Sequence, residues 1–282
     1  MYKIYLTSFL MIILPVILIS TLVVLAKYSY SIAPVSNGTE DDQFLVQSNI
    51  NQDINGGSGN DVIFNNNGKG HVNGGPGDDV IFTGPHSNSS IDGGLGSDTI
   101  IIMGGNNSFR DPDGNDTIYT ISGANHINGG PGDNVMFISN GINTIKAGLG
   151  SDSIFVFNGT NTIKGGPGGD MIFSMGGNNT VVGGSGDNII VGNTSKNVLI
   201  GGSGNDFIYG KGKNDLLVGG AGENVLWAAG AGNTTLVGGS GTDRLIGGPG
   251  IDHFICGTGN EIIIGFNATK GDTKTASCTN NQ

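Results

Sequence analysis

The chain is poor in basic residues and in cysteine. Of 282 residues only 12 are lysine or arginine, against 23 aspartates and glutamates, which gives a formal net charge of −11. A nucleic-acid-binding surface needs clustered positive charge, so this composition argues against DNA or RNA as a partner. The two cysteines, Cys256 and Cys278, match no CxxC or Cys/His zinc pattern. They either form one disulfide that pins the C-terminal tail, which we favour in an oxidising compartment, or remain two free thiols.

A catalytic constellation is also missing from the sequence. The four histidines, His71, His86, His126 and His253, do not cluster, and no Ser/His/Asp arrangement stands out. Strings that look like GxGxxG lack the strand–turn–helix context of a nucleotide site. We therefore expect a protein that is not an enzyme.

Helical periodicity is absent except at the N-terminus, where residues 4–26 are almost wholly apolar between Lys3 and Lys27. This segment predicts one hydrophobic helix long enough to span a bilayer. It is either a cleaved secretory signal or a retained transmembrane anchor, and we leave both open. In both cases the chain that follows residues 1–34 is expected outside the cell. The protein is then either secreted or anchored in the membrane through residues 4–26.

Glycine dominates the rest of the chain, with 54 residues, but not at the every-third spacing of collagen. It recurs in six-residue segments such as Gly56-Gly-Ser-Gly-Asn-Asp61 and Gly74-Gly-Pro-Gly-Asp-Asp79. Successive segments begin 18 residues apart, with two steps of 19, which is the signature of a repeat protein. Position six of the segment is occupied in turn by Asp61, Asp79, Asp98, Asp116, Asn134, Asp152, Asp170, Asn188, Asp206, Asn224, Asp243 and Glu261.

Each segment is followed by three strand-forming residues whose middle member is always apolar, as in Ile63, Ile81 and Ile100. A second apolar column, which includes Phe109 and Ile127, lies halfway between. Since neighbouring strand residues point to opposite faces, both columns are expected to point inward. The sequence therefore predicts an all-β fold: a right-handed parallel β-roll or β-helix solenoid with 18-residue coils over 35–265, followed by a tail over 266–282.

The position-six acids are expected to form a ladder about 5 Å apart along one edge of the roll. Such a ladder repels itself, and a divalent hard cation between successive turns removes the repulsion. Ca²⁺ takes carboxylate and carbonyl oxygens as ligands. The pattern Gly-Gly-x-Gly-x-Asp resembles the RTX, or hemolysin-type, calcium-binding repeat. By position, the resemblance implies several calcium ions held by Asp61, Asp79, Asp98, Asp116, Asp152, Asp170, Asp206 and Asp243.

The opposite edge departs from this family, because its turns carry asparagine at position six. We expect a one-sided roll, with calcium on one edge and a hydrogen-bonded asparagine ladder on the other. The ladder comprises Asn107, Asn125, Asn143, Asn161, Asn179, Asn197 and Asn233. Two acids near the C-terminus, Asp215 and Asp252, are expected to restore calcium sites on this second edge.

The calcium edge has gaps of its own. Asn134, Asn188 and Asn224 stand where the other turns have aspartate, and each follows an acidic residue: Asp133, Asp187 and Glu223. These acids are either displaced ligands or solvent-facing groups beside a vacant site.

An aromatic column lies on one outward face of the predicted strands. It either docks a partner (a cell-surface polymer, a protein or a second copy) or stiffens the sheet by stacking. Its members are Phe64, Phe82, Tyr119, Phe137, Phe155, Phe173, Tyr209 and Trp227.

The expected function is that of an exported or cell-surface structural or interaction module whose roll folds on Ca²⁺. The alternatives are an accessory subunit of a polysaccharide-acting or proteolytic system and an adhesin that binds a glycan or another lattice.

Overall fold

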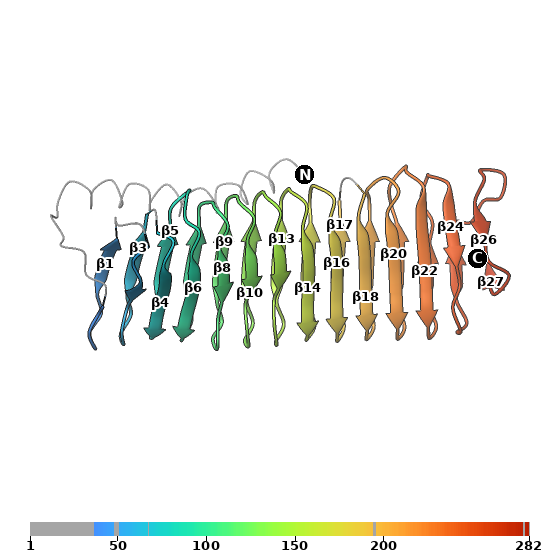
Figure 1. Ribbon diagram of the computed structural model, residues 1–282. Coiled ribbons are helices and arrows are strands. Elements are labelled where there is room, and N and C mark those ends of the chain that lie inside the picture. The colour runs from blue at the N-terminus through green and yellow to red at the C-terminus, as the bar shows by residue number, and fades with distance from the viewer. Residues whose placement is uncertain (1–36, 48–50, 67, 194–195, 279, 282) are drawn as a thin grey trace, which may run out of the picture. The chain divides into compact units, whose positions relative to one another are not determined.

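The computed structural model describes residues 37–47, 51–66, 68–193, 196–278 and 280–281. Their strands form two parallel sheets, of 14 and 13 strands, which stack coil on coil along the roll (Figure 1). The predicted parallel β-solenoid is therefore confirmed. The predicted N-terminal hydrophobic helix lies outside the described residues. Within them, no helix is long and apolar enough to cross a membrane.

The odd-numbered strands make the larger sheet and the even-numbered strands the smaller one. The 14-stranded sheet contains β1 (Phe44–Gln47), β3 (Val62–Asn65), β5 (Val80–Thr83), β7 (Thr99–Ile102), β9 (Thr117–Thr120), β11 (Val135–Ile138), β13 (Ser153–Val156), β15 (Met171–Ser174), β17 (Ile189–Gly192), β19 (Phe207–Gly210), β21 (Val225–Ala228), β23 (Arg244–Ile246), β25 (Ile262–Ile264) and β27 (Asn280–Asn281). The 13-stranded sheet contains β2 (Ile54–Asn55), β4 (His71–Pro76), β6 (Ser90–Leu95), β8 (Ser108–Arg110), β10 (His126–Asn128), β12 (Thr144–Lys146), β14 (Thr162–Pro167), β16 (Thr180–Ser185), β18 (Val198–Ser203), β20 (Leu216–Ala221), β22 (Thr234–Ser240), β24 (Asp252–Ile255) and β26 (Thr273–Lys274).

The register places equivalent residues of successive coils side by side. Ile63 pairs with Ile81, 18 residues later, whereas Ile81 pairs with Ile100 across one of the two longer coils. The extra residue of a long coil is absorbed outside the strands, because the ladders from β1 to β25 keep the apolar columns aligned. In the tail, Phe254 pairs instead with Lys274 and Ile263 with Asn281. A slip of one residue would turn those columns to solvent.

Two inward columns form the core of the roll. The strands of the 14-stranded sheet alternate between partly exposed and buried side chains, as in β13, where Ile154 and Val156 are buried. The second column lies on the 13-stranded sheet and includes Val72, Ile91 and Phe109, all 0% exposed. Side chains from the two sheets meet in a single narrow cluster. Each coil adds only a few of these side chains, so the core becomes stable through stacking rather than within one coil.

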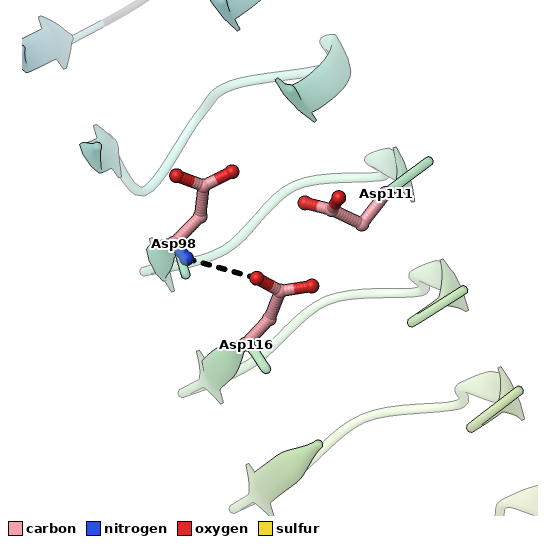
Figure 2. A group of neighbouring side chains, drawn as sticks. All are labelled: Asp98, Asp111 and Asp116. Carbon is pink, nitrogen blue, oxygen red and sulfur yellow. Dashed lines mark hydrogen bonds between the residues drawn. The ribbon is translucent and has the colours of Figure 1, made fainter. Parts of the chain in front are cut away.

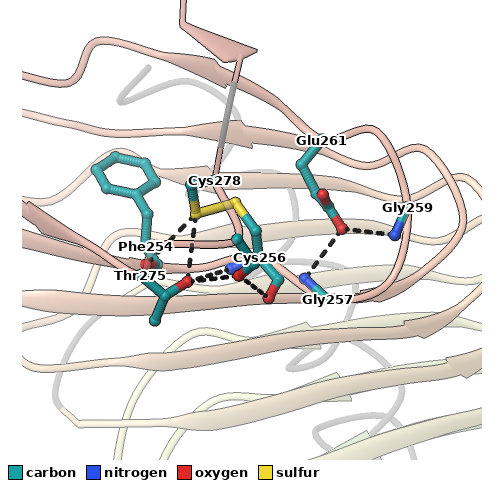
Figure 3. Close-up of a disulfide and its surroundings, with 8 residues drawn as sticks. Phe254, Cys256, Gly257, Gly259, Glu261, Thr275 and Cys278 are labelled. Atoms are coloured by element: carbon teal, nitrogen blue, oxygen red, sulfur yellow. Dashed lines mark hydrogen bonds between the residues drawn. A yellow bond between two sulfur atoms is a disulfide. The ribbon is translucent and has the colours of Figure 1, made fainter.

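The C-terminal tail closes the last coil. A disulfide joins Cys256 to Cys278 (Figure 3), as favoured from the sequence. The Ser277 hydroxyl donates to the Cys256 carbonyl at 2.9 Å. The tail also adds β26 and β27 to the ends of the two sheets. In the final turn, Glu261 accepts backbone hydrogen bonds from Gly257 and Gly259 within its own loop.

Candidate metal centre

The six-residue turn precedes the strands of the 14-stranded sheet from β3 to β25, and glycine determines its shape. In the turn from Gly74 to Asp79, Gly75 and Gly77 have φ values of 113° and 139°. Residues with a side chain rarely adopt such positive φ values, and glycine adopts them without a Cβ clash. A Cβ on Gly75 would also lie 1.8 Å from the Gly57 carbonyl oxygen of the preceding coil. These glycines therefore allow the turns to stack closely.

One oxygen of each position-six aspartate holds the neighbouring coil. The backbone N–H of Asp61 donates to Asp79 Oδ1 at 2.7 Å, and that of Asp79 donates to Asp98 Oδ1 at 2.7 Å. The pattern continues along the edge as far as the N–H of Asn224, which donates to Asp243 Oδ1 at 2.8 Å. The ladder of acids predicted from the spacing is thus bound to the backbone by one oxygen per residue.

The second oxygen, Oδ2, is buried, and no hydrogen-bond donor in the described part of the chain reaches it. This holds for all eight acids of the edge: Asp61, Asp79, Asp98, Asp116, Asp152, Asp170, Asp206 and Asp243. An ionised carboxylate buried without compensation costs much free energy. The unsatisfied oxygens therefore indicate that a cation or a proton belongs beside them.

Burial accordingly raises the pKa of these groups. The pKa of Asp79, Asp116 and Asp152 rises to about 7. For Asp98 and Asp170 it rises to about 6. Desolvation is the largest cause in each case, because burial penalises the charged form.

The Oδ2 atoms of Asp61, Asp79, Asp98, Asp170 and Asp206 each face a small oxygen-lined slot beside the position-one glycine. A methyl group on Gly74 would lie 2.2 Å from Asp79 Oδ2 and 2.2 Å from the Gly93 carbonyl oxygen of the next coil. At Gly165 the corresponding oxygens belong to Asp170, at 2.0 Å, and to Gly183, at 2.5 Å. Ca²⁺ binds such oxygens at about 2.3–2.6 Å. The residues present therefore fit a calcium ion between consecutive coils.

The sequence profile of the RTX calcium-binding nonapeptide repeat, which spans four copies, matches residues 53–72, 64–100, 113–138, 137–172, 173–208, 200–236 and 229–263. The chain belongs to this RTX repeat family. No curated protein matches the chain.

In the RTX turns that carry asparagine at position six, the side-chain amide donates a hydrogen bond within its own turn, so no cation is needed there. The Asn188 side-chain amide occupies the place of Oδ2 and donates to the Gly186 carbonyl at 2.9 Å. Asn134 and Asn224 make the same contact with Gly132 and Gly222, at 3.3 and 3.5 Å.

The acids that precede these asparagines do not point into the slots. Asp133 and Asp187 are exposed and accept backbone hydrogen bonds from Ser151 and Asn205 of the next coil, each at 2.7 Å. Glu223 is exposed as well. This geometry favours the interpretation that the acids face solvent beside vacant slots over the one in which they are displaced ligands.

The opposite edge carries the predicted asparagine ladder from Asn107 to Asn197, but the inclusion of Asn233 was wrong: Asn233 is exposed, and the buried Thr234 donates its backbone N–H to Asp252 in its place. The backbone N–H and the side-chain amide of Asn143 both donate to Asn161 Oδ1, at 3.1 and 2.9 Å. The same pair of bonds joins Asn107 to Asn125 and Asn125 to Asn143. Each asparagine Oδ1 thus accepts hydrogen bonds from the neighbouring coil. Between Asn107 and Asn179 the position-six side chains of this edge are therefore neutral amides rather than buried carboxylates.

Asp215 and Asp252 lie on that second edge in a different environment from the eight acids. Asp215 accepts from the N–H groups of Asn197 and Gly212, both at 2.8 Å, through its two oxygens. Asp252 accepts from Thr234 at 3.3 Å and from Gly248 at 2.9 Å. A calcium ion at either residue would have to share an oxygen that already accepts a hydrogen bond.

One buried acid of the calcium edge was not anticipated. Asp111 lies within reach of Asp98 and Asp116, and its Oδ2 also lacks a described donor (Figure 2). Burial, and then the charge of Asp116, raise the pKa of Asp111 to about 9. Its signal in the sequence was the segment Asp111-Pro-Asp-Gly-Asn-Asp116, in which an acid replaces the position-one glycine of the repeat.

Proposed function

We propose that the roll binds calcium ions along the carboxylate edge and that these ions join consecutive coils. The observation that carries the proposal is the set of eight buried Oδ2 atoms that no donor in the described residues reaches, five of which face an oxygen-lined slot beside a position-one glycine. We place the ions at Asp61, Asp79, Asp98, Asp116, Asp152, Asp170, Asp206 and Asp243, and leave Asp215 and Asp252 outside the set because their oxygens are already engaged.

Calcium supplies positive charge where the fold buries negative charge. A slot is lined by a carboxylate of one coil and a carbonyl of the next, as with Asp170 and Gly183. An ion held by both oxygens offsets the repulsion along the ladder and also ties the two coils together. Ion binding is then part of the folding free energy.

We further propose that the roll is a structural or interaction module outside the cell rather than an enzyme. The RTX repeat occupies most of the chain, from residue 53 to residue 263. The Cys256–Cys278 disulfide supports an oxidising compartment, since such bonds persist mainly in exported proteins. Export through residues 4–26 stays a prediction from the sequence, because that segment lies outside the described residues.

The aromatic column stiffens the 14-stranded sheet. Phe137, Phe155 and Phe173 stack with centroids 5.2 and 5.5 Å apart and planes within 12° of parallel. Tyr119 stacks on Phe137 in the same way, at 5.1 Å. These contacts support the stacking interpretation of the column. Docking of a surface polymer, a protein or a second copy on it stays a prediction from the sequence.

Calcium binding on this edge is tested by counting ions. The change Asp170→Asn should remove one bound ion, because the amide would donate to its own turn as Asn188 does. Isothermal titration calorimetry of the full-length chain in a mild uncharged detergent gives the count. The matched control Asp215→Asn, on the asparagine edge, should leave the count unchanged. A wild-type chain that binds no calcium would refute the function, and an equal loss in the control would refute the choice of edge.

A further inference from the structure

The turn from Asp111 to Asp116 departs from the other turns at its first two positions. In other turns position two is a glycine with positive φ, such as Gly94 at 121°. Here it is Pro112, whose ring fixes φ near −65° and excludes that conformation. Position one, which is glycine or alanine in the regular turns before and after it, is Asp111. The departure therefore places the carboxylate of Asp111 on the calcium edge, as a third acid beside Asp98 and Asp116.

This third carboxylate enters the slot of the preceding coil. A methyl group on Gly93 would lie 1.9 Å from Asp111 Oδ2 and 2.5 Å from Asp98 Oδ2. In the slot beside Gly74 the first of these places is taken by a backbone carbonyl oxygen, that of Gly93. Asp111 thus exchanges a neutral ligand for a charged one.

Three acids converge at this point. Carboxylate oxygens of Asp98, Asp111 and Asp116 all lie within 4.8 Å of one another (Figure 2). The residues are 1%, 4% and 1% exposed, and the Oδ2 atom of each lacks a described hydrogen-bond donor. These are independent observations: the acids are clustered, and each also directs an unsatisfied buried oxygen into the cluster.

No basic side chain in the described residues neutralises the cluster. The neighbouring Arg110 pairs instead with Asp92, and Lys270, near the C-terminus, pairs with Asp252 and Asp272. Three carboxylates so close together cannot all remain ionised without a cation. Since the number of charged ligands sets calcium affinity, this slot differs from the others in strength.

We propose that Asp98, Asp111 and Asp116 form a three-carboxylate calcium site that binds its ion more tightly than the other slots and fills first. The inference rests on the proposed calcium binding and names the residue, Asp111, that makes one site stronger. A first ion at this position orders the coils on both sides of it, because the three ligands come from two successive coils.

The test is a competition titration of the full-length chain in mild uncharged detergent against a chromophoric calcium chelator. In the wild type we expect one ion with an affinity at least about tenfold above that of the rest. The change Asp111→Gly restores the usual position-one residue. It should abolish the tight class without lowering the total number of ions, because an ordinary slot remains beside Gly93.

Asp170→Asn provides the matched control. It removes an ordinary carboxylate three coils away, beside Gly165, and should cost one ion while leaving the tight class intact. If Asp111→Gly keeps the tight ion, the three-carboxylate site is refuted although calcium binding stands. If the wild type binds no calcium at all, the proposed function fails first. If all wild-type ions bind with one affinity, only the inference fails.

Discussion

Removal of calcium should abolish most of the β-sheet signal of the protein. Without ions, eight buried Oδ2 atoms along one edge have neither a donor nor a counter-charge in the described structure. The core that opposes this cost is a narrow cluster of two apolar columns. The 54 glycines add to the entropy that folding must overcome. We therefore expect the ion-free chain at neutral pH to be largely unfolded.

Far-UV circular dichroism of the full-length chain, before and after EGTA, measures this effect. Added calcium should restore the signal, and magnesium at the same concentration should restore much less of it. Mg²⁺ demands near-octahedral geometry at about 2.0–2.1 Å and gives up water reluctantly, which suits a backbone-lined slot poorly. A β-sheet signal that survives complete removal of metal would show that the roll tolerates its buried carboxylates, and calcium would lose its role in folding.

Acid should partly replace calcium. In the folded roll the pKa of Asp79, Asp116 and Asp152 is about 7, against an ordinary value of 3.8. Between these values the metal-free folded state binds protons that the unfolded chain does not. Its stability is therefore greatest below about pH 4 and is lost as pH rises through about 7. Circular dichroism of chelating-resin-treated protein should show β structure returning as pH falls from 7.5 to 5, values chosen to bracket the shifted pKa range.

With saturating calcium, the pH dependence between pH 7.5 and 5 should largely disappear, because the ions already neutralise the carboxylates. Protons and calcium compete for the same Oδ2 atoms, so the folded roll should bind calcium less tightly as the solution is acidified, while less calcium is needed to half-fold the chain. The triple variant Asp79→Asn, Asp116→Asn, Asp152→Asn serves as control, because amides do not titrate and its metal-free form should respond less to acid. A metal-free wild type that gains structure with rising pH would contradict the raised pKa values.

The solenoid could be predicted from the sequence because its information is local and repeated. Alternation places Ile154 inside and its neighbours outside, whatever the rest of the chain does. Glycine at positions two and four fixes the turn, and the 18-residue step fixes which residues become neighbours. Even the asparagine ladder follows from that step, since Asn143 and Asn161 must meet once the coils stack.

The chemistry of individual acids was decided by tertiary contacts. In sequence, Asp215 and Asp170 both follow a glycine-containing turn, but the N–H of Gly212 reaches one Asp215 oxygen while Asp170 Oδ2 has no described donor. Asp111 was missed because its place in the repeat gave no sign of a ligand. It occupies a position where the repeat has glycine, and only the stacking of its turn on the preceding coil brings it to Asp98.

The sequence by itself therefore determined the period, the inward columns, the two edges and the family, because each depends on residues a fixed step apart. The tertiary structure decided which carboxylate oxygens stay unsatisfied and where three of them converge. That outcome depends on backbone N–H groups and on neighbouring coils within a few ångströms, and it cannot be read from spacing along the chain.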